Sequence, residues 1–171
     1  IERTGDIRSY KKDLVDLYVN RDQHSFSTQV TDLDNIQNPS IHSLLSSKYH
    51  EAQMHRLNIH AEIPDPVIHN YLTDLDLAVV LGHLMDNAID GARKASEGFI
   101  SLAYFDEEDC QSFIIESTIA EEQVPLSMMS TQLSHPEGGI GVNAVQDILE
   151  RYPNTSFSVR SQNHKMMQIL E

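Results

Sequence analysis

The chain has 171 residues, of which 40% are hydrophobic, enough for one domain of ordinary size or a small domain with an appendage. Its formal net charge of −14 argues against a surface for nucleic acid or an anionic membrane, because both would repel the protein. The single cysteine, Cys110, excludes an internal disulfide framework and fits a reducing compartment, and no apolar run reaches the roughly 18 residues of a membrane span.

The first 52 residues have helical spacing but few apolar side chains. A further helical run follows Pro39. A helix this poor in apolar residues cannot bury enough surface alone, so we expect it to need a partner helix, either from a second copy of the chain or from an upstream segment. The spaced apolar residues of the first run are Ile7, Tyr10, Leu14, Leu17 and Tyr18. We predict two parts, a helical segment over 1–52 and a domain over 53–171.

Residues 56–63 alternate between apolar and polar side chains, which predicts a half-buried strand. Thr73 can then cap a long helix that runs to Ala95. Asp74 and Asp76 lie in its first turn, where the helix dipole favours acids.

This helix carries a polar stripe at the i, i+3, i+4, i+7 spacing, formed by His83, Asp86, Asn87 and Asp90. The stripe has two interpretations. It is either the solvent face of an amphipathic helix or the lining of a polar pocket. In the second case Asn87 offers its amide oxygen to a divalent ion. Mg²⁺ takes oxygen ligands and keeps much of its water, so one protein oxygen together with nucleotide phosphates is a normal arrangement.

Two alternating segments, 99–105 and 110–118, predict a hairpin. The stretch 119–138 has little periodicity, and a loop of this length in a compact domain is usually functional or mobile. A helix over 140–152 and a final strand pair complete the chain. Strands grouped in hairpins with helices between them predict an α+β fold, a two-layer α/β sandwich with helices on one face of a mixed sheet.

Gly139 and Gly141 precede the last helix. Glycines allow the backbone to approach a phosphate, and a helix start favours an anion. Many tight turns have the same pattern, so the motif alone also fits a purely structural turn.

The run from His83 to Ala92, His-Leu-Met-Asp-Asn-Ala-Ile-Asp-Gly-Ala, resembles the N box of the Bergerat-fold (GHKL) ATPases, which include gyrase B, Hsp90, MutL and sensor histidine kinases. It is most similar to the peptide-pheromone quorum-sensing kinases of the agr and competence type. The predicted order of strands and helices is also that of the Bergerat fold. Residues 34–48 resemble the second helix of the dimerisation hairpin in these kinases, which implies that the phosphoacceptor histidine lies outside this fragment.

The resemblance implies binding of ATP and Mg²⁺. Asn87 would hold the metal, supported by His83 and Asp86, with Asp90 on the same helix face. Ser117 stands at the adenine contact, and Gly139 and Gly141 would hold phosphate. His83 stands where gyrase and Hsp90 carry a glutamate that activates water. The resemblance therefore implies phosphoryl transfer rather than hydrolysis, although His83 remains a possible base.

Two positions depart from the family pattern. Kinases usually carry Asp or Asn where this chain has Ser117, and a lysine in the lid where it has Gln132. These departures leave open a degenerate domain kept for dimerisation or regulation. An ATP hydrolase of the same fold is the third alternative.

The resemblance further implies a cytoplasmic fragment of a membrane-bound bacterial sensor kinase. The intact kinase would be a homodimer and would pass its phosphoryl group to a response regulator. No membrane segment and no nucleic-acid partner are expected for the fragment itself.

Overall fold

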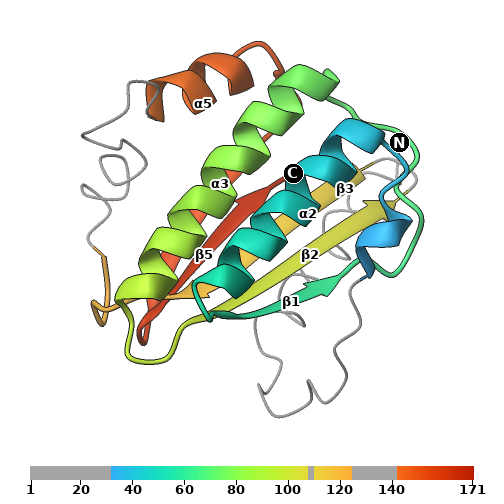
Figure 1. The fold of residues 1–171 in the computed structure, drawn as a ribbon. Coiled ribbons are helices and arrows are strands. Elements are labelled where there is room, and N and C mark those ends of the chain that lie inside the picture. The colour runs from blue at the N-terminus through green and yellow to red at the C-terminus, as the bar shows by residue number, and fades with distance from the viewer. Residues whose placement is uncertain (1–31, 108–109, 125–141) are drawn as a thin grey trace.

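Five strands form one mixed sheet in the order β1-β2-β3-β5-β4 (Figure 1). The computed structural model describes residues 32–107, 110–124 and 142–171. β1 pairs parallel with β2, and every other neighbouring pair is antiparallel. The strands are β1 (Asn58–Glu62), β2 (Phe99–Glu107), β3 (Cys110–Thr118), β4 (Phe157–Gln162) and β5 (Lys165–Leu170). The predicted hairpin and final strand pair are confirmed, with β2 extending two residues further than its alternation indicated.

Helix α3 (Asp74–Lys94) is the crossover that the parallel pair β1–β2 requires. Its start is as predicted, because Thr73 Oγ1 accepts a hydrogen bond from Asp76 N at 3.3 Å. Arg93 and Lys94 lie in the last turn, where the helix dipole favours cations. The apolar side of α3 is buried in the core and includes Leu77, Leu81, Leu84, Ala88 and Ala92.

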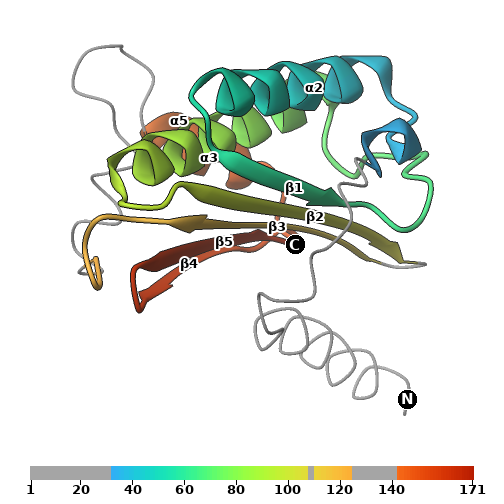
Figure 2. The same ribbon diagram turned by 60° about the horizontal axis from the view of Figure 1, so that its bottom comes forward.

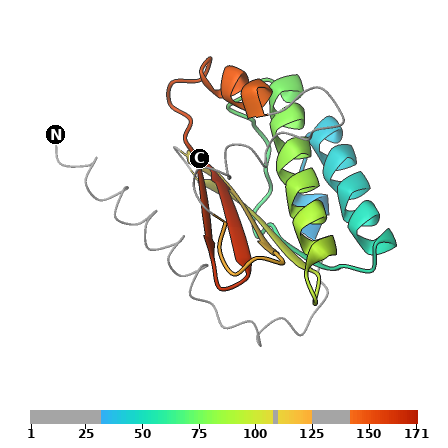
Figure 3. The same ribbon diagram turned by 90° about the vertical axis from the view of Figure 1, so that its left-hand side faces the viewer.

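The helices that the structure describes lie on one face of the sheet, as predicted (Figures 2 and 3). Besides α3 they are α2 (Pro39–Met54) and α5 (Val142–Leu149), and a short 3-10 helix, η2 (Asp32–Asn35), precedes α2. The helix-facing side chains of β1, β2 and β3 alternate with outward ones, so Ile59 and Ala61 join the core while His60 does not. The result is the α+β sandwich expected from the sequence.

Helix α2 packs on α3 within the same hydrophobic core, with Ile41, Leu45 and Ala52 fully buried. Its partner helix is therefore α3 of this chain, rather than the second copy or upstream helix that the sequence suggested. The boundary predicted between residues 52 and 53 falls inside α2. The segment before residue 32 lies outside the described residues, so its predicted helix and its separation from the domain remain predictions.

In the described part of the chain, no helix is long and apolar enough to cross a membrane.

After β3 the chain is held to the sheet at Val124, whose N–H donates to Ser161 Oγ at 2.8 Å and whose carbonyl accepts from it at 3.1 Å. Residues 125–141, which follow, lie outside the described residues. Val124 is therefore the last described anchor before them, and α5 begins directly after them.

Candidate functional site

Asn87 lies on the side of α3 that faces α5. Asp76, eleven residues earlier, contacts Arg151 at the end of α5, and eleven residues are close to three full helical turns. The amide nitrogen Nδ2 of Asn87 is buried and has no hydrogen-bond partner among the described residues. A buried amide N–H without a partner costs about 1–3 kcal/mol. This cost is offset when a ligand supplies the acceptor.

Ser117 lies below the same stretch of α3, near the end of β3. Its hydroxyl is fully buried and likewise lacks a partner within the described structure. Gly91, four residues after Asn87, lies close to the end of β3: a Cβ there would be 3.9 Å from Ser117 Oγ and 3.1 Å from Ile119 Cγ2. A side chain at position 91 would therefore fill the space beside Ser117 that glycine leaves open.

Asp86 does not face this space. It is one residue, or about 100°, away from Asn87 around the helix. Its Oδ1 forms an ion pair with Lys48 Nζ of α2 at 2.5 Å. Lys48 also contacts Glu51 at 2.8 Å. Burial lowers the pKa of Lys48, but its hydrogen bonds to Asp86 and Glu51 outweigh this, so the pKa is raised and the amine is charged at neutral pH. Asp86 thus joins α3 to α2, and the polar stripe divides between two sides of the helix.

His83 and Asp90 lie between these two sides. Both are half-buried. Asp90 is 3.8 Å from Arg93 Nη1, which lies one turn further along α3. The predicted glycines, Gly139 and Gly141, and the lid position Gln132 lie outside the described residues, so these three positions remain predictions.

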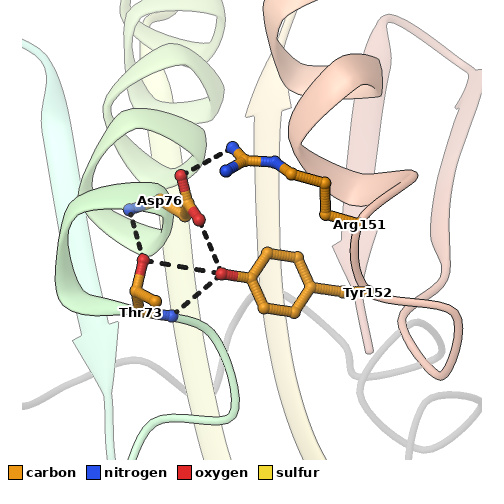
Figure 4. A network of polar contacts seen from close by, with 4 residues as sticks. All are labelled: Thr73, Asp76, Arg151 and Tyr152. Carbon is orange, nitrogen blue, oxygen red and sulfur yellow. Dashed lines mark hydrogen bonds and ion pairs between the residues drawn. The ribbon is translucent and has the colours of Figure 1, made fainter.

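Sequence analysis missed the network that fixes α5 against α3 (Figure 4). Tyr152 OH donates to Asp76 Oδ2 at 2.6 Å, and Arg151 Nη2 lies 2.8 Å from Asp76 Oδ1. Thr73 N donates to Tyr152 OH at 3.2 Å. The Tyr152 hydrogen bond is the largest cause of the lowered pKa of Asp76, with Thr73 and Arg151 contributing less against the effect of burial. We call these four residues the α3–α5 clasp.

A second missed residue is Gln168 of β5. It is fully buried, and its Nε2 donates to the backbone carbonyl of Leu84 in α3 at 3.0 Å, while its Oε1 has no partner in the described structure. The sequence carried a signal for it, since Gln168 interrupts the inward apolar positions Met166 and Leu170. A polar side chain at an inward strand position indicates a buried hydrogen bond or a site.

The family profile described as the GHKL domain matches residues 72–171. Among solved structures, the nucleotide-free catalytic domain of histidine kinase ThkA is similar with a TM-score of 0.62 and 13% identity, over 78% of this chain and 90% of that one. The histidine kinase domain of the Erythrobacter litoralis EL346 blue-light activated kinase has a TM-score of 0.56 at 14% identity, over 77% and 62% of the two chains. The Acinetobacter baumannii histidine kinase AdeS has a TM-score of 0.53 at 17% identity, over 77% of this chain and 61% of that one. A search of curated protein sequences returned no match.

Proposed function

Because the chain belongs to the GHKL domain family, we propose that it binds ATP with Mg²⁺ on the side of α3 that carries Asn87. We further propose that it is the catalytic part of a sensor histidine kinase, which transfers the γ-phosphoryl group to a histidine outside this fragment. The fold likeness to histidine kinase catalytic domains supports this proposal.

The observation that carries the proposal is the pair of buried polar groups without partners in the described structure, Asn87 Nδ2 and Ser117 Oγ. Ser117 Oγ lies 3.9 Å from the position of a Cβ on Gly91, which is one helical turn after Asn87 on α3. An asparagine amide offers both a donor and an acceptor. Asn87 Oδ1 would hold Mg²⁺, and Nδ2 would donate to a phosphate oxygen. Bound Mg²⁺ would neutralise charge on the phosphates.

The adenine end of the site would be at Ser117. A serine hydroxyl can accept a hydrogen bond from the adenine amino group, as the usual carboxylate or amide would, but without a negative charge. Catalysis would then depend on positioning of the phosphoryl group for in-line attack, with His83 beside the metal ligand and no glutamate to activate water. These residue roles favour phosphoryl transfer over hydrolysis.

The intact protein would be a membrane-anchored bacterial kinase that forms a homodimer and phosphorylates a response regulator. The N-box sequence supports peptide quorum sensing as its signalling role. The alternative is a degenerate domain that regulates a partner without catalysis, and Ser117 together with the missing lid lysine at Gln132 favours it.

Calorimetry of ATP binding with and without Mg²⁺ tests the proposal. We expect Mg²⁺-dependent binding that Asn87→Ala weakens by at least about tenfold, equivalent to about 1.4 kcal/mol. Asn58→Ala, at an exposed position of β1, is the matched control and should bind like the parent chain. If the parent chain fails to bind at millimolar ATP, the degenerate domain is the better explanation. If it binds, transfer of labelled γ-phosphate to a kinase hairpin supplied in trans tests the reaction itself.

A further inference from the structure

A cavity of about 410 Å³ lies at the opposite end of α3 from Asn87. It is lined by the start of α3, Tyr104 of β2, the first half of β3, residues 151–156 after α5 and the C-terminal end of β5. Leu77 lines it ten residues before Asn87, which is a distance of about 15 Å along the helix. The cavity is therefore separate from the proposed nucleotide site.

Several of the polar groups that line the cavity already have hydrogen-bond partners. Tyr152 OH is bound to Asp76 within the α3–α5 clasp, and Tyr104 OH donates to Gln111 Oε1 at 3.2 Å. Burial raises the pKa of Tyr104, so its phenol stays neutral. Among the described residues, two charged side chains line the cavity, and both are already engaged: Arg151 pairs with Asp76, and Glu171 Oε2 accepts from Ser156 Oγ at 3.4 Å. A charged ligand would therefore lose hydration and compete with existing contacts, which favours an uncharged one.

The remaining surface of the cavity is apolar or aromatic. Leu72, Leu77, Phe113 and Leu170 line it, and all four are less than one-tenth exposed. Tyr71 borders the cavity with 59% of its surface exposed, so the site is open to solvent on this side. The volume lies within the range of about 300–1,000 Å³ that is typical of small-molecule pockets.

We propose that this cavity is a second ligand site, which takes a small, uncharged, mainly apolar molecule with an aromatic ring. The ligand would pack between Leu77 of α3 and Phe113 of β3, against the ring of Tyr152. The proposal does not depend on nucleotide binding, because none of these residues belongs to the proposed ATP site.

Cys110 allows a direct test, because it lines the cavity and is the only cysteine in the chain. The protein is equilibrated with dibenzyl disulfide, cystamine and dithiodiglycolate at equal concentration, so that the Cys110 thiolate attacks a disulfide, forms a mixed disulfide and releases the other half as a thiol. The adducts are counted by intact mass spectrometry. The same exchange in denaturant gives the intrinsic preference of the thiol. We expect the benzyl adduct to be enriched about tenfold in the folded protein after this correction. Equal occupancy of the three adducts would overturn the proposal.

A cavity-filling variant locates the effect. Thr155→Trp adds an indole from the turn that lines the cavity, and the benzyl preference should then disappear. Ser158→Trp, at an exposed position of β4, is the matched control and should retain it. The chain has no natural tryptophan, so the emission wavelength of the introduced side chain reports whether it is buried. A buried indole at position 155 with an unchanged benzyl preference would also refute the site.

Discussion

Ser117 and Ser161 are two buried serines on the helix-facing side of the same sheet, and we expect their alanine variants to have opposite effects on stability. Ser117 Oγ lacks a partner in the described structure, whereas Ser161 Oγ bonds to both the N–H and the carbonyl of Val124. The two side chains are 0% and 8% exposed, so burial is comparable and the difference lies in the hydrogen bonds.

The magnitudes follow from the cost of a buried polar group without a partner, about 1–3 kcal/mol. Ser117→Ala removes such a group, so the free energy of unfolding should stay unchanged or rise by up to about 2 kcal/mol. Ser161→Ala leaves two backbone groups of Val124 without their partner and should lower it by about 1–3 kcal/mol. Urea titration followed by circular dichroism measures both variants against the parent chain.

The same Ser117→Ala variant should bind ATP about 2- to 10-fold more weakly, because a neutral hydrogen bond contributes about 0.5–1.5 kcal/mol. A stabilised protein with weaker nucleotide binding is typical of a residue that is poised for a ligand. If Ser117→Ala is instead destabilised as much as Ser161→Ala, its hydroxyl has a partner in solution, and the reasoning from unpaired groups fails. Unchanged ATP affinity would remove Ser117 from the site.

Three further predictions concern α3. Gly82→Ala should raise the stability measured in thermal melts by up to about 1 kcal/mol, since the added Cβ would meet only Leu44 Cδ1 at 3.9 Å. Gly91→Ala should raise the stability less and should weaken ATP binding, because its Cβ would lie 3.1 Å from Ile119 Cγ2. Lys48→Met should lower the free energy of unfolding by no more than about 1 kcal/mol in urea titrations, because the Asp86 side chain is 43% exposed and stays hydrated. A much larger loss of stability would mean that the Lys48–Asp86 pair is shielded from solvent. The pKa of Asp76 is lower in the folded protein than in the unfolded chain, so ionised Asp76 stabilises the fold above the ordinary carboxyl pKa of about 3.9. This stabilisation is lost as the pH falls through the pKa of Asp76 in the folded protein. Parent and Asp76→Asn stabilities should therefore converge below about pH 4, and parallel curves would show that the clasp does not lower this pKa.

The limits of α3 and the alternation of the strands could be predicted because both depend on local chemistry. Thr73 caps α3 through its own first turn, and the inward positions of β1 follow from a period of two residues. The sandwich follows in turn, since each element has one apolar face to bury. The position of Asn87 on a half-buried side of α3 was also available from helical spacing.

The neighbours of each polar side chain were decided only by the tertiary structure. Helical spacing groups Asp86 with Asn87, but α2 packs on one side of α3 and the turn after α5 meets the other. Lys48 therefore pairs with Asp86, while Asn87 Nδ2 has no partner among the described residues. The contact of Arg151 with Asp76 spans 75 residues of sequence. Period and capping determine which face a residue occupies, because they act within a few residues. Which partner meets that face depends on sheet order and helix packing, and these are set by the burial of the whole core.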